Sequence, residues 1–337
     1  MIDLSRNENP FGPPSNVIEA LRDSHERIFR YDSEKLTLRL AREISKLHRI
    51  PIECMILGNG AKGILIRLFR DLARVQESPR VLISEYSWQF YRKIARAFGW
   101  QIHFFELNQD FSYDVESILE KISLVNPHMV LITSPNNPTG NVLRRRELIR
   151  ILENTPDKTI VILDETFIGF SNYDESVDLV TSHPNFGVIK SFSKYFALAG
   201  LRVGYGIFGQ IVREALRIEE EKDSYSYLGQ LSTPQAIGAI TALSSQDYYN
   251  GITRKLTEQR ELIFRRISQI GFKIYPSETN FLLVEIPENM MSKLRELLAE
   301  NNIKIKFFEE ENLRNYVRIS IGTEEENQEL FRVFKLV

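Results

Sequence analysis

A lysine in an apolar setting is the residue of this chain whose chemistry is easiest to specify. Lys194 lies between Phe192 and Tyr195 in the stretch VIKSFSKYFALAGLRVGYG. Burial among such neighbours would penalise the charged ammonium, lower its pKa and make a neutral, nucleophilic amine available, which is the basis of Schiff-base lysines. A lysine that extends from a helix end toward solvent fits the same residues. The neighbourhood of Lys194 alone therefore leaves both interpretations open.

Two nearby groups of residues have the chemistry of an anion site. Ser191 and Ser193 precede Lys194, and Arg202 follows it by eight residues. Hydroxyls and a guanidinium fork bind phosphate well. The glycine turn at residues 58–62 opens a predicted helix, and it would offer backbone N–H groups and the positive end of the helix dipole. Glycine turns before helices are common, so this turn is weak support when taken alone.

Three further residues with chemical potential each follow a predicted strand. They are Asn137 in the turn SPNNPTG, Asp164 in DETF and Trp88 in YSW. In open parallel α/β sheets, ligands bind at the edge where the strands end. A buried carboxylate needs a partner such as a protonated ring nitrogen, although Asp164 would serve as a helix cap equally well. Trp88 would stack on a ring or pack into the core.

One ligand accounts for all of these groups. It is a phosphorylated aromatic aldehyde with a basic ring nitrogen, pyridoxal 5'-phosphate. The lysine would bond to the aldehyde, the aspartate would keep the ring protonated as an electron sink, and the hydroxyls and arginine would anchor the phosphate.

The composition limits the remaining classes of function. With 337 residues, 43% of them hydrophobic and 26% charged, the chain has an ordinary globular composition and room for a large core beside a smaller domain. A net charge of -2 predicts neither a nucleic-acid nor a membrane partner. The single cysteine and scattered histidines predict no disulfide and no metal site. Neither a transmembrane stretch nor a signal peptide is recognisable, which predicts a cytoplasmic protein.

The elements that must position these residues alternate between strands and helices. Strands are predicted at 81–84, 102–106, 129–133, 159–163, 187–191 and 203–207, and helices between them at 88–98, 115–122 and 145–152. Several strands are almost continuously apolar, which indicates a largely parallel sheet covered on both faces in an α/β domain.

The segments before and after this alternating region have a different character. Residues 1–14 are rich in turn formers. Helices are predicted at 36–47, 210–222, 233–243 and 252–270. The C-terminal part predicts a small α+β unit, with strands at 272–275, 280–284, 303–307 and 317–321 and helices at 290–301 and from 324 onward. The predicted organisation is a segment 1–30 that joins the small domain, a large cofactor-binding domain 31–245 and a small domain 246–337.

The combined motifs resemble a known family. SPNNPTG, DETF, SFSK and GLRVGY, in this order, are similar to the fold-type I, class II pyridoxal-phosphate-dependent aminotransferases. RNENPFGP, SETNF and VRISIGTEEEN narrow the resemblance to histidinol-phosphate aminotransferases, and threonine-phosphate decarboxylases are also similar. The resemblance covers almost the whole chain. It implies a large domain with a mainly parallel sheet flanked by helices, together with a smaller α+β domain.

The resemblance also implies a role for each matching residue. Lys194 would be the Schiff-base lysine and proton shuttle, Asp164 the partner of the pyridine nitrogen, Asn137 the contact of the ring oxygen and Trp88 the stacking aromatic. The implied phosphate cup consists of Gly60, Ala61, Lys62, Ser191, Ser193 and Arg202. Tyr31 would reach the phosphate held by the partner subunit, which implies an obligate homodimer with a shared active site. Arg318 would bind the substrate carboxylate, and Lys306 and Asn9 would lie at the substrate.

Three departures from the family pattern concern the substrate and the tuning of the cofactor. Phe167 stands where the aminotransferases usually have a tyrosine. The loss of the tyrosine hydroxyl would raise the pKa of the Schiff base and leave Asn137 as the main contact of the ring oxygen. Lys306 replaces an arginine that contacts the distal phosphate, with less directional binding. The sequence starts at MIDLSRNENP, without the arm that supplies a substrate-side tyrosine or the decarboxylase's glycine-rich motif.

These observations lead to one main hypothesis and several alternatives. The main one is transfer of an amino group between an amino acid or phosphorylated amine, histidinol phosphate first, and 2-oxoglutarate. The alternatives are decarboxylation of threonine phosphate or a similar phospho-amino acid, and transfer from aromatic amino acids. A non-catalytic regulatory protein on the same fold is disfavoured by the intact set of Lys194, Asp164 and Arg202.

Overall fold

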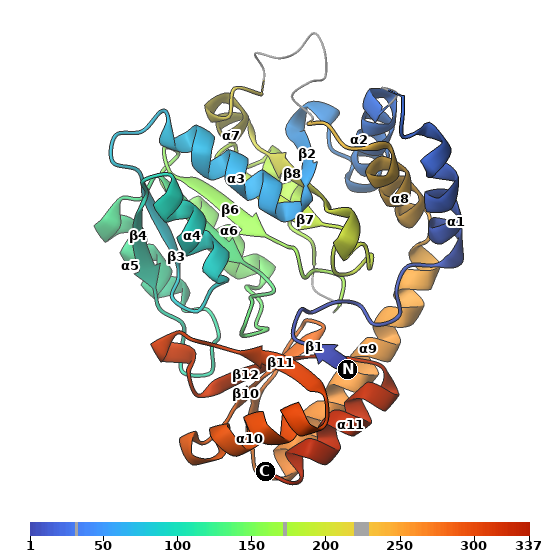
Figure 1. Ribbon diagram of the computed structural model, residues 1–337. Helices are drawn as coiled ribbons and strands as arrows, with labels where there is room; N and C mark the ends of the chain where they lie inside the picture. Colours follow the sequence, from blue (N-terminus) through green and yellow to red (C-terminus); the bar gives the residue numbers. More distant parts are fainter. Residues whose placement is uncertain (31–32, 171–173, 219–228) are drawn as a thin grey trace.

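Two β-sheets organise the computed structural model, which describes residues 1–30, 33–170, 174–218 and 229–337 (Figure 1). The larger sheet has seven strands in the order β2-β8-β7-β6-β5-β3-β4. These strands are β2 (Met55–Asn59), β3 (Arg80–Ser84), β4 (Gln101–Phe105), β5 (Met129–Thr133), β6 (Ile160–Asp164), β7 (Phe186–Ser191) and β8 (Val203–Phe208).

The prediction of a largely parallel sheet is confirmed. The strands β4, β3, β5, β6 and β7 pair in parallel, whereas β8 is antiparallel to both β7 and β2. The strands β5 and β6 are buried along their whole length, as expected for strands covered on both faces. Their carboxyl ends, Thr133 and Asp164, are paired residues and lie side by side at one edge of the sheet.

Helices connect and cover these strands. They are α1 (Ser15–Ser24), α2 (Ser33–His48), α3 (Gly60–Ala73), α4 (Gln89–Ala97), α5 (Val115–Val125), α6 (Arg145–Glu153), α7 (Gln210–Ala215), α8 (Thr233–Leu243) and α9 (Gln246–Gln269). Short 3-10 turns occur at His25–Arg27, Ile52–Cys54, Val177–Thr181, Ala199–Leu201 and Glu311–Leu313. In the described part of the chain, every helix is too short or too polar to cross a membrane.

One helix prediction is wrong in its length. A helix was expected over 210–222, but α7 ends at Ala215. The chain turns at Leu216, and Arg217 has a φ of +53°, a left-handed conformation that no right-handed helix can continue through. Residues 219–222 of that prediction lie outside the described residues.

The smaller sheet has the order β1-β11-β12-β10-β9. It is built from β1 (Ile2–Leu4), β9 (Lys273–Tyr275), β10 (Phe281–Glu285), β11 (Ile303–Phe307) and β12 (Tyr316–Ser320), with α10 (Glu288–Glu300) and α11 (Glu324–Phe334). The strand β1 corrects the turn-rich interpretation of residues 1–14, because Ile2–Leu4 pair in parallel with β11. A three-residue strand is specified by its distant partner, so local sequence gives little sign of it. The boundaries proposed for the domains stay a prediction.

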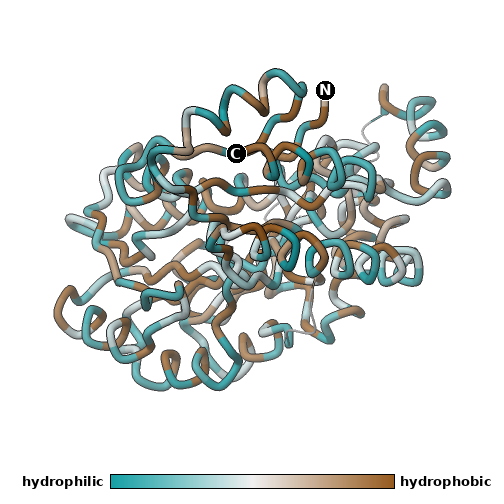
Figure 2. Tube along the Cα trace, turned by 90° about the horizontal axis from the view of Figure 1, so that it is seen from below, coloured by the Kyte–Doolittle hydropathy of each residue, from teal (hydrophilic) through white to brown (hydrophobic). Residues whose placement is uncertain are grey.

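Each sheet has its own hydrophobic core. One cluster of buried side chains surrounds the seven-stranded sheet, and a second fills the space between the five-stranded sheet and α9, α10 and α11. Figure 2 shows peripheral helices that alternate between hydrophilic and hydrophobic residues along their turns, as expected for helices that bury one face. The chain therefore has two hydrophobic cores, one for each sheet.

An ion network that is buried at Lys190 and Glu165 and reaches the surface at Glu175 connects the strands that carry the candidate site. The Lys190 ammonium on β7 lies 3.1 Å from a Glu165 carboxylate oxygen and 3.0 Å from one of Glu175. Glu175 in turn lies 3.3 Å from His48 Nδ1, and His48 Nε2 is 2.9 Å from the Tyr205 hydroxyl of β8. Glu165 directly follows Asp164, and Lys190 directly precedes Ser191. The network thus ties together the ends of β6 and β7, where both residues emerge.

Candidate active site

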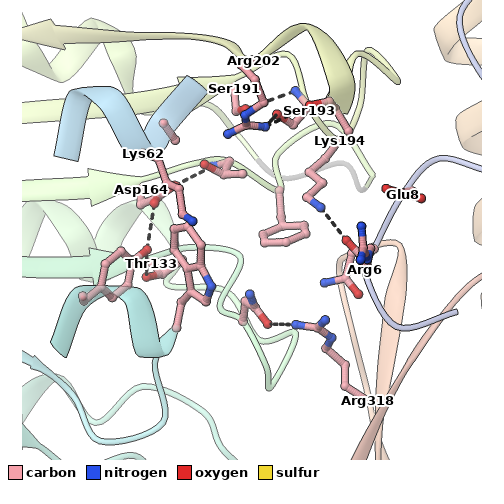
Figure 3. A pocket seen from close by; sticks show the side chains of 18 residues that line it. Arg6, Glu8, Lys62, Thr133, Asp164, Ser191, Ser193, Lys194, Arg202 and Arg318 are labelled. Carbon is pink, nitrogen blue, oxygen red and sulfur yellow. Dashed lines mark hydrogen bonds between the residues drawn. The ribbon is translucent and has the colours of Figure 1, made fainter. Parts of the chain in front are cut away.

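A cavity of about 480 Å³ lies at the carboxyl edge of the large sheet. The chain brings to it the strand ends Thr133, Asp164 and Ser191, the first turn of α3, and Arg318 from the smaller sheet. Figure 3 shows the labelled side chains converging on this space from both sheets and from the N-terminal segment with Arg6 and Glu8. Of the predicted site residues, Ala61, Lys62, Trp88, Asn137, Asp164, Phe167, Ser191, Ser193, Lys194, Arg202 and Arg318 line it.

Lys194 lines the cavity with a partly buried side chain. Its ammonium nitrogen donates to the backbone carbonyl of Arg6 at 2.7 Å and lies 5.7 Å from the centre of the Phe167 ring. Burial and the nearby guanidinium of Arg318 lower the pKa of Lys194 to about 7, although Glu8 opposes the shift. A neutral amine is therefore much more accessible near neutral pH here than for an ordinary lysine.

Asp164 is an almost completely buried carboxyl group at the end of β6. Its Oδ1 accepts from the backbone N–H of Thr166 at 2.9 Å, and its Oδ2 accepts from the Tyr91 hydroxyl at 2.8 Å. Burial raises the pKa of Asp164 above its usual value, and these hydrogen bonds act in the opposite direction. No lysine or arginine of the described residues forms an ion pair with Asp164. A positively charged atom of a ligand would therefore provide the cationic partner that this buried carboxylate needs.

An anion cradle lies on the other side of the cavity. Arg202 Nη1 donates to the Ser193 hydroxyl at 3.1 Å and to the Ala199 carbonyl at 3.0 Å. The helix α3 starts at Gly60, and its N-cap residue Asn59 makes no side-chain capping bond, so N–H groups of the first turn face the cradle without that partner. Gly60 has a φ of +71°, and a Cβ there would lie 2.5 Å from Arg202 Nη2. Only glycine lets the backbone approach this guanidinium so closely.

Lys62, a predicted member of the phosphate cup, lines the cavity next to two aromatic rings. Its ammonium nitrogen lies 4.6 Å from the centre of the Phe90 ring and 5.6 Å from the centre of the Trp88 ring. These cation–π contacts direct the side chain to the aromatic wall, while its backbone stays in the first turn of α3.

Arg318 and Asn137 form the wall on the side of the smaller sheet. Arg318 Nη1 donates to Asn137 Oδ1, and Nη2 donates to the Ser5 carbonyl at 2.7 Å. Burial lowers the pKa of Arg318 to about 9. Its Nε is buried without a hydrogen-bond partner among the described residues, which leaves a donor for an anionic ligand. Phe167 packs edge-to-face on Phe281, with ring centres 5.2 Å apart, so this edge of the cavity carries no hydroxyl.

Four predicted site residues are not among those that line this cavity: Gly60 begins α3 at the cradle, Lys306 lines an adjoining cavity, and the other two are Asn9 and Tyr31. Asn9 does not line it: its side chain donates to the Tyr195 carbonyl at 3.3 Å and accepts from the Phe11 N–H at 3.2 Å. Asn9 thus stabilises the conformation of the N-terminal segment, whereas the preceding residues Arg6, Asn7 and Glu8 line the cavity. Tyr31 lies outside the described residues.

The sequence analysis overlooked several residues that line the cavity. They are Arg6, Asn7, Glu8, Tyr91, Thr133, Thr166 and Ala199. One feature of the sequence could have identified Tyr91 as a site residue. It follows Trp88 by three residues, and this spacing puts both side chains on one side of a helix start. Thr133 ends a predicted strand, so the rule that singled out Asp164 applies to it as well.

A second cavity, of about 530 Å³, adjoins the first. The two share the lining residues Arg6, Trp88, Asn137 and Arg318. The outer part is lined by Lys304 and Lys306 of β11, with the single carboxylate of Glu310. Lys306 pairs with Arg318 across neighbouring antiparallel strands, so both residues lie on one face of the smaller sheet.

The first cavity fits pyridoxal 5'-phosphate. The cradle of Arg202, Ser193 and the α3 first turn offers donors for a phosphate, and the buried carboxylate of Asp164 is suited to a protonated ring nitrogen. Lys194 has the lowered pKa that bonding to an aldehyde requires. When bound, this cofactor supplies an electron sink for charge that develops on the substrate.

Known proteins resemble the chain over its whole length. The family model "Aminotransferase class I and II" matches residues 1–334. The chain is 32% identical to the chloroplastic histidinol-phosphate aminotransferase of Nicotiana tabacum, over 99% of this chain and 78% of that protein. It is 32% identical to the histidinol-phosphate aminotransferase of Methanosarcina mazei, over 100% of this chain and 88% of that protein.

Solved structures agree in fold. The histidinol-phosphate aminotransferase of Sinorhizobium meliloti in complex with pyridoxal-5'-phosphate superposes with a TM-score of 0.87 at 22% identity, covering 99% of this chain and 90% of that one. The L-threonine-O-3-phosphate decarboxylase of Porphyromonas gingivalis gives 0.83 at 20% identity, covering 100% and 99%. The fold and the aminotransferase resemblance predicted from the motifs are confirmed: this chain belongs to the class I and II aminotransferases, pyridoxal-phosphate-dependent enzymes of fold type I.

Proposed function

We propose that this enzyme transfers an amino group from a phosphorylated amine, histidinol phosphate first, to 2-oxoglutarate. The observation that carries the proposal is the second cavity, which Lys304 and Lys306 line and which shares lining residues with the cavity that contains Lys194. Arg318 faces the same side of the sheet as Lys306. Like charges directly opposite each other destabilise a sheet, so an anion bound between them would stabilise the arrangement. The relatives in Nicotiana tabacum and Methanosarcina mazei are named histidinol-phosphate aminotransferases, which supports histidinol phosphate as the amino donor.

The residues around the cavity have distinct tasks in this proposal. Asp164 holds the ring nitrogen protonated, Trp88 covers the ring, and Arg202 anchors the phosphate of the cofactor. Lys194 would take the proton from the substrate carbon that bears the amino group and give it to the cofactor's C4' carbon in the same half of the reaction, and the second half would run this transfer in reverse. Arg318 binds the carboxylate of the oxo acid, for which its unpartnered buried Nε is a ready donor.

A decarboxylase of threonine phosphate or a similar phospho-amino acid is the second candidate. The observation that favours it is Phe167, which packs on Phe281 and removes the hydroxyl that aminotransferases usually have at this edge. Such a donor would use the same basic second cavity for its phosphate. Aromatic amino acids are a further alternative, because Trp88, Phe307 and Phe308 also line that cavity.

The experiment compares substrates with the wild-type holoenzyme. Incubation with histidinol phosphate and 2-oxoglutarate is expected to yield glutamate, whereas threonine phosphate is expected to yield no carbon dioxide. In Lys306→Ala, the KM for histidinol phosphate is expected to rise about tenfold and the KM for 2-oxoglutarate by less, since one charged contact to the distal phosphate is lost. The exposed Lys158→Ala is the matched control and should change neither constant.

The outcomes separate the candidates. Carbon dioxide from threonine phosphate would replace the proposal with the decarboxylase. Glutamate formed from phenylalanine or tyrosine, but not from histidinol phosphate, would replace it with an aromatic aminotransferase. An equal loss for both substrates in Lys306→Ala would contradict a phosphate contact at Lys306.

We also propose a homodimer with a shared active site. The resemblance implies it, and Ile28 and Phe29, which are 65% and 72% exposed just before residue 31, form an apolar surface suited to a second copy. A monomer in sedimentation equilibrium of the holoenzyme would contradict this proposal. A cytoplasmic location and the absence of a nucleic-acid partner stay predictions from the sequence.

A further inference from the structure

A buried tyrosine lies directly behind the carboxylate of Asp164. Tyr91 of α4 is 1% exposed, and its hydroxyl is 2.8 Å from Asp164 Oδ2 and 2.9 Å from the Thr133 hydroxyl. Figure 3 shows the dashed contacts that run from the labelled Thr133 and Asp164 to one intervening hydroxyl. Burial and the Asp164 charge raise the pKa of Tyr91 well above its ordinary value, so the phenol keeps its proton throughout the neutral range.

The three groups form a chain with a fixed direction. A phenol has one proton, and an ionised carboxylate can only accept, so the Tyr91 proton points to Asp164. Thr133 then donates its own proton to the Tyr91 oxygen. Donors arranged in series polarise one another, which strengthens the last hydrogen bond to the carboxylate. The second oxygen, Oδ1, accepts from the Thr166 N–H at 2.9 Å, so both oxygens of Asp164 are oriented by the protein.

Tyr91 also contacts the aromatic wall of the cavity. Its ring meets that of Trp88 edge to face, with centres 5.7 Å apart and planes at 81°. One side chain therefore touches both the carboxylate that would face the ring nitrogen and the aromatic that would cover the ring. Tyr91 and Trp88 both line the cavity.

We propose that Tyr91, supported by Thr133, is a positioning residue that keeps Asp164 ionised and oriented toward the ring nitrogen of the bound cofactor. The proposal rests on the role of Asp164 in the proposed function. Burial alone favours the neutral carboxylic acid, which would leave the proton on Asp164 and the ring nitrogen neutral. The Tyr91 hydrogen bond stabilises the charged form and so keeps the proton on the ring.

The test uses two cofactors that differ in one atom. Full-length protein freed of cofactor is titrated with pyridoxal 5'-phosphate and with its analogue that carries a carbon atom in place of the ring nitrogen, and affinity is measured by fluorescence. Tyr91→Phe is expected to weaken pyridoxal phosphate about tenfold, as for one hydrogen bond to a charged group, and the analogue less than twofold. Thr133→Val does not change a direct contact of Asp164. It should also weaken the affinity for pyridoxal phosphate more than the affinity for the analogue, but by less than Tyr91→Phe does.

Two matched variants make the result interpretable. Tyr249→Phe removes another buried hydroxyl, which donates to the Phe196 carbonyl at 3.1 Å, and should change neither affinity. Asp164→Asn should weaken pyridoxal phosphate selectively, which verifies the contact on which the inference depends.

Each outcome has one meaning. Equal losses for both cofactors in Tyr91→Phe and Thr133→Val would overturn the proposal and indicate a structural role only. Selectivity in Asp164→Asn without selectivity in Tyr91→Phe would overturn the role of Tyr91 alone. No selectivity in Asp164→Asn would overturn the role of Asp164 and the inference with it.

Discussion

Lys194→Ala is expected to lower the rate of amino-group transfer by about 10²–10⁴-fold, the contribution of a positioned group that transfers a proton. Lys194 is the amine with a pKa near 7 in the first cavity, and it is held by the Arg6 carbonyl at 2.7 Å. The variant should still bind the cofactor through the cradle of Arg202 and the first turn of α3. Steady-state production of glutamate at saturating substrates measures the loss.

The control and the contrary result for this variant are simple. Lys158→Ala, at an exposed position, should keep the wild-type rate. A small primary amine added to Lys194→Ala should restore part of the activity, because it supplies a mobile base in the vacated space. Retention of more than a tenth of the wild-type kcat in Lys194→Ala would mean that another group moves the proton.

Asp164→Asn is expected to lower kcat by about 10²–10³-fold, the effect of removing one oriented electrostatic contact from a buried site. The amide cannot balance a positive ring nitrogen, so the ring loses its proton and becomes a weaker electron sink. The loss should appear in kcat more than in the KM of either substrate, because the charge develops during the reaction. Single-turnover absorbance measurements follow this step directly.

A carboxylate far from the cavity is the matched control for Asp164→Asn. Asp71, near the C-terminal end of α3, forms ion pairs with Arg67, Arg70 and Arg74, and Asp71→Asn should leave kcat unchanged. If Asp164→Asn kept kcat within threefold of wild type, Asp164 would not be the partner of the ring nitrogen.

The central residues of the site could be predicted because their chemistry follows directly after apolar strands. Asp164 and Ser191 end β6 and β7, and the parallel sheet brings them to one edge. Lys194 and Arg202 follow in the same stretch of sequence, so local order was enough to group them. Several of the strands are nearly unbroken apolar runs, which are typical of a sheet covered on both faces.

Other features depend on partners distant in sequence and could not be predicted. The strand β1 exists because β11 offers it an edge some three hundred residues away. The side chain of Lys62 turns to the rings of Trp88 and Phe90 instead of the phosphate cradle, a choice set by tertiary contact. Tyr91 looks like an ordinary core aromatic until its hydroxyl is placed beside Asp164.

The position of the covalent bond to the cofactor is the most direct test of this account. Protein freed of cofactor is mixed with pyridoxal 5'-phosphate at a series of pH values, reduced with borohydride, digested and mapped by mass spectrometry. We expect the phosphopyridoxyl group on Lys194, with labelling that rises with pH and is half-maximal near pH 7, because only the neutral amine reacts and burial lowers its pKa to about 7. An ordinary lysine, with a pKa of about 10.4, would label only at higher pH. A label on another lysine, or none on Lys194 at pH 8, would contradict the account.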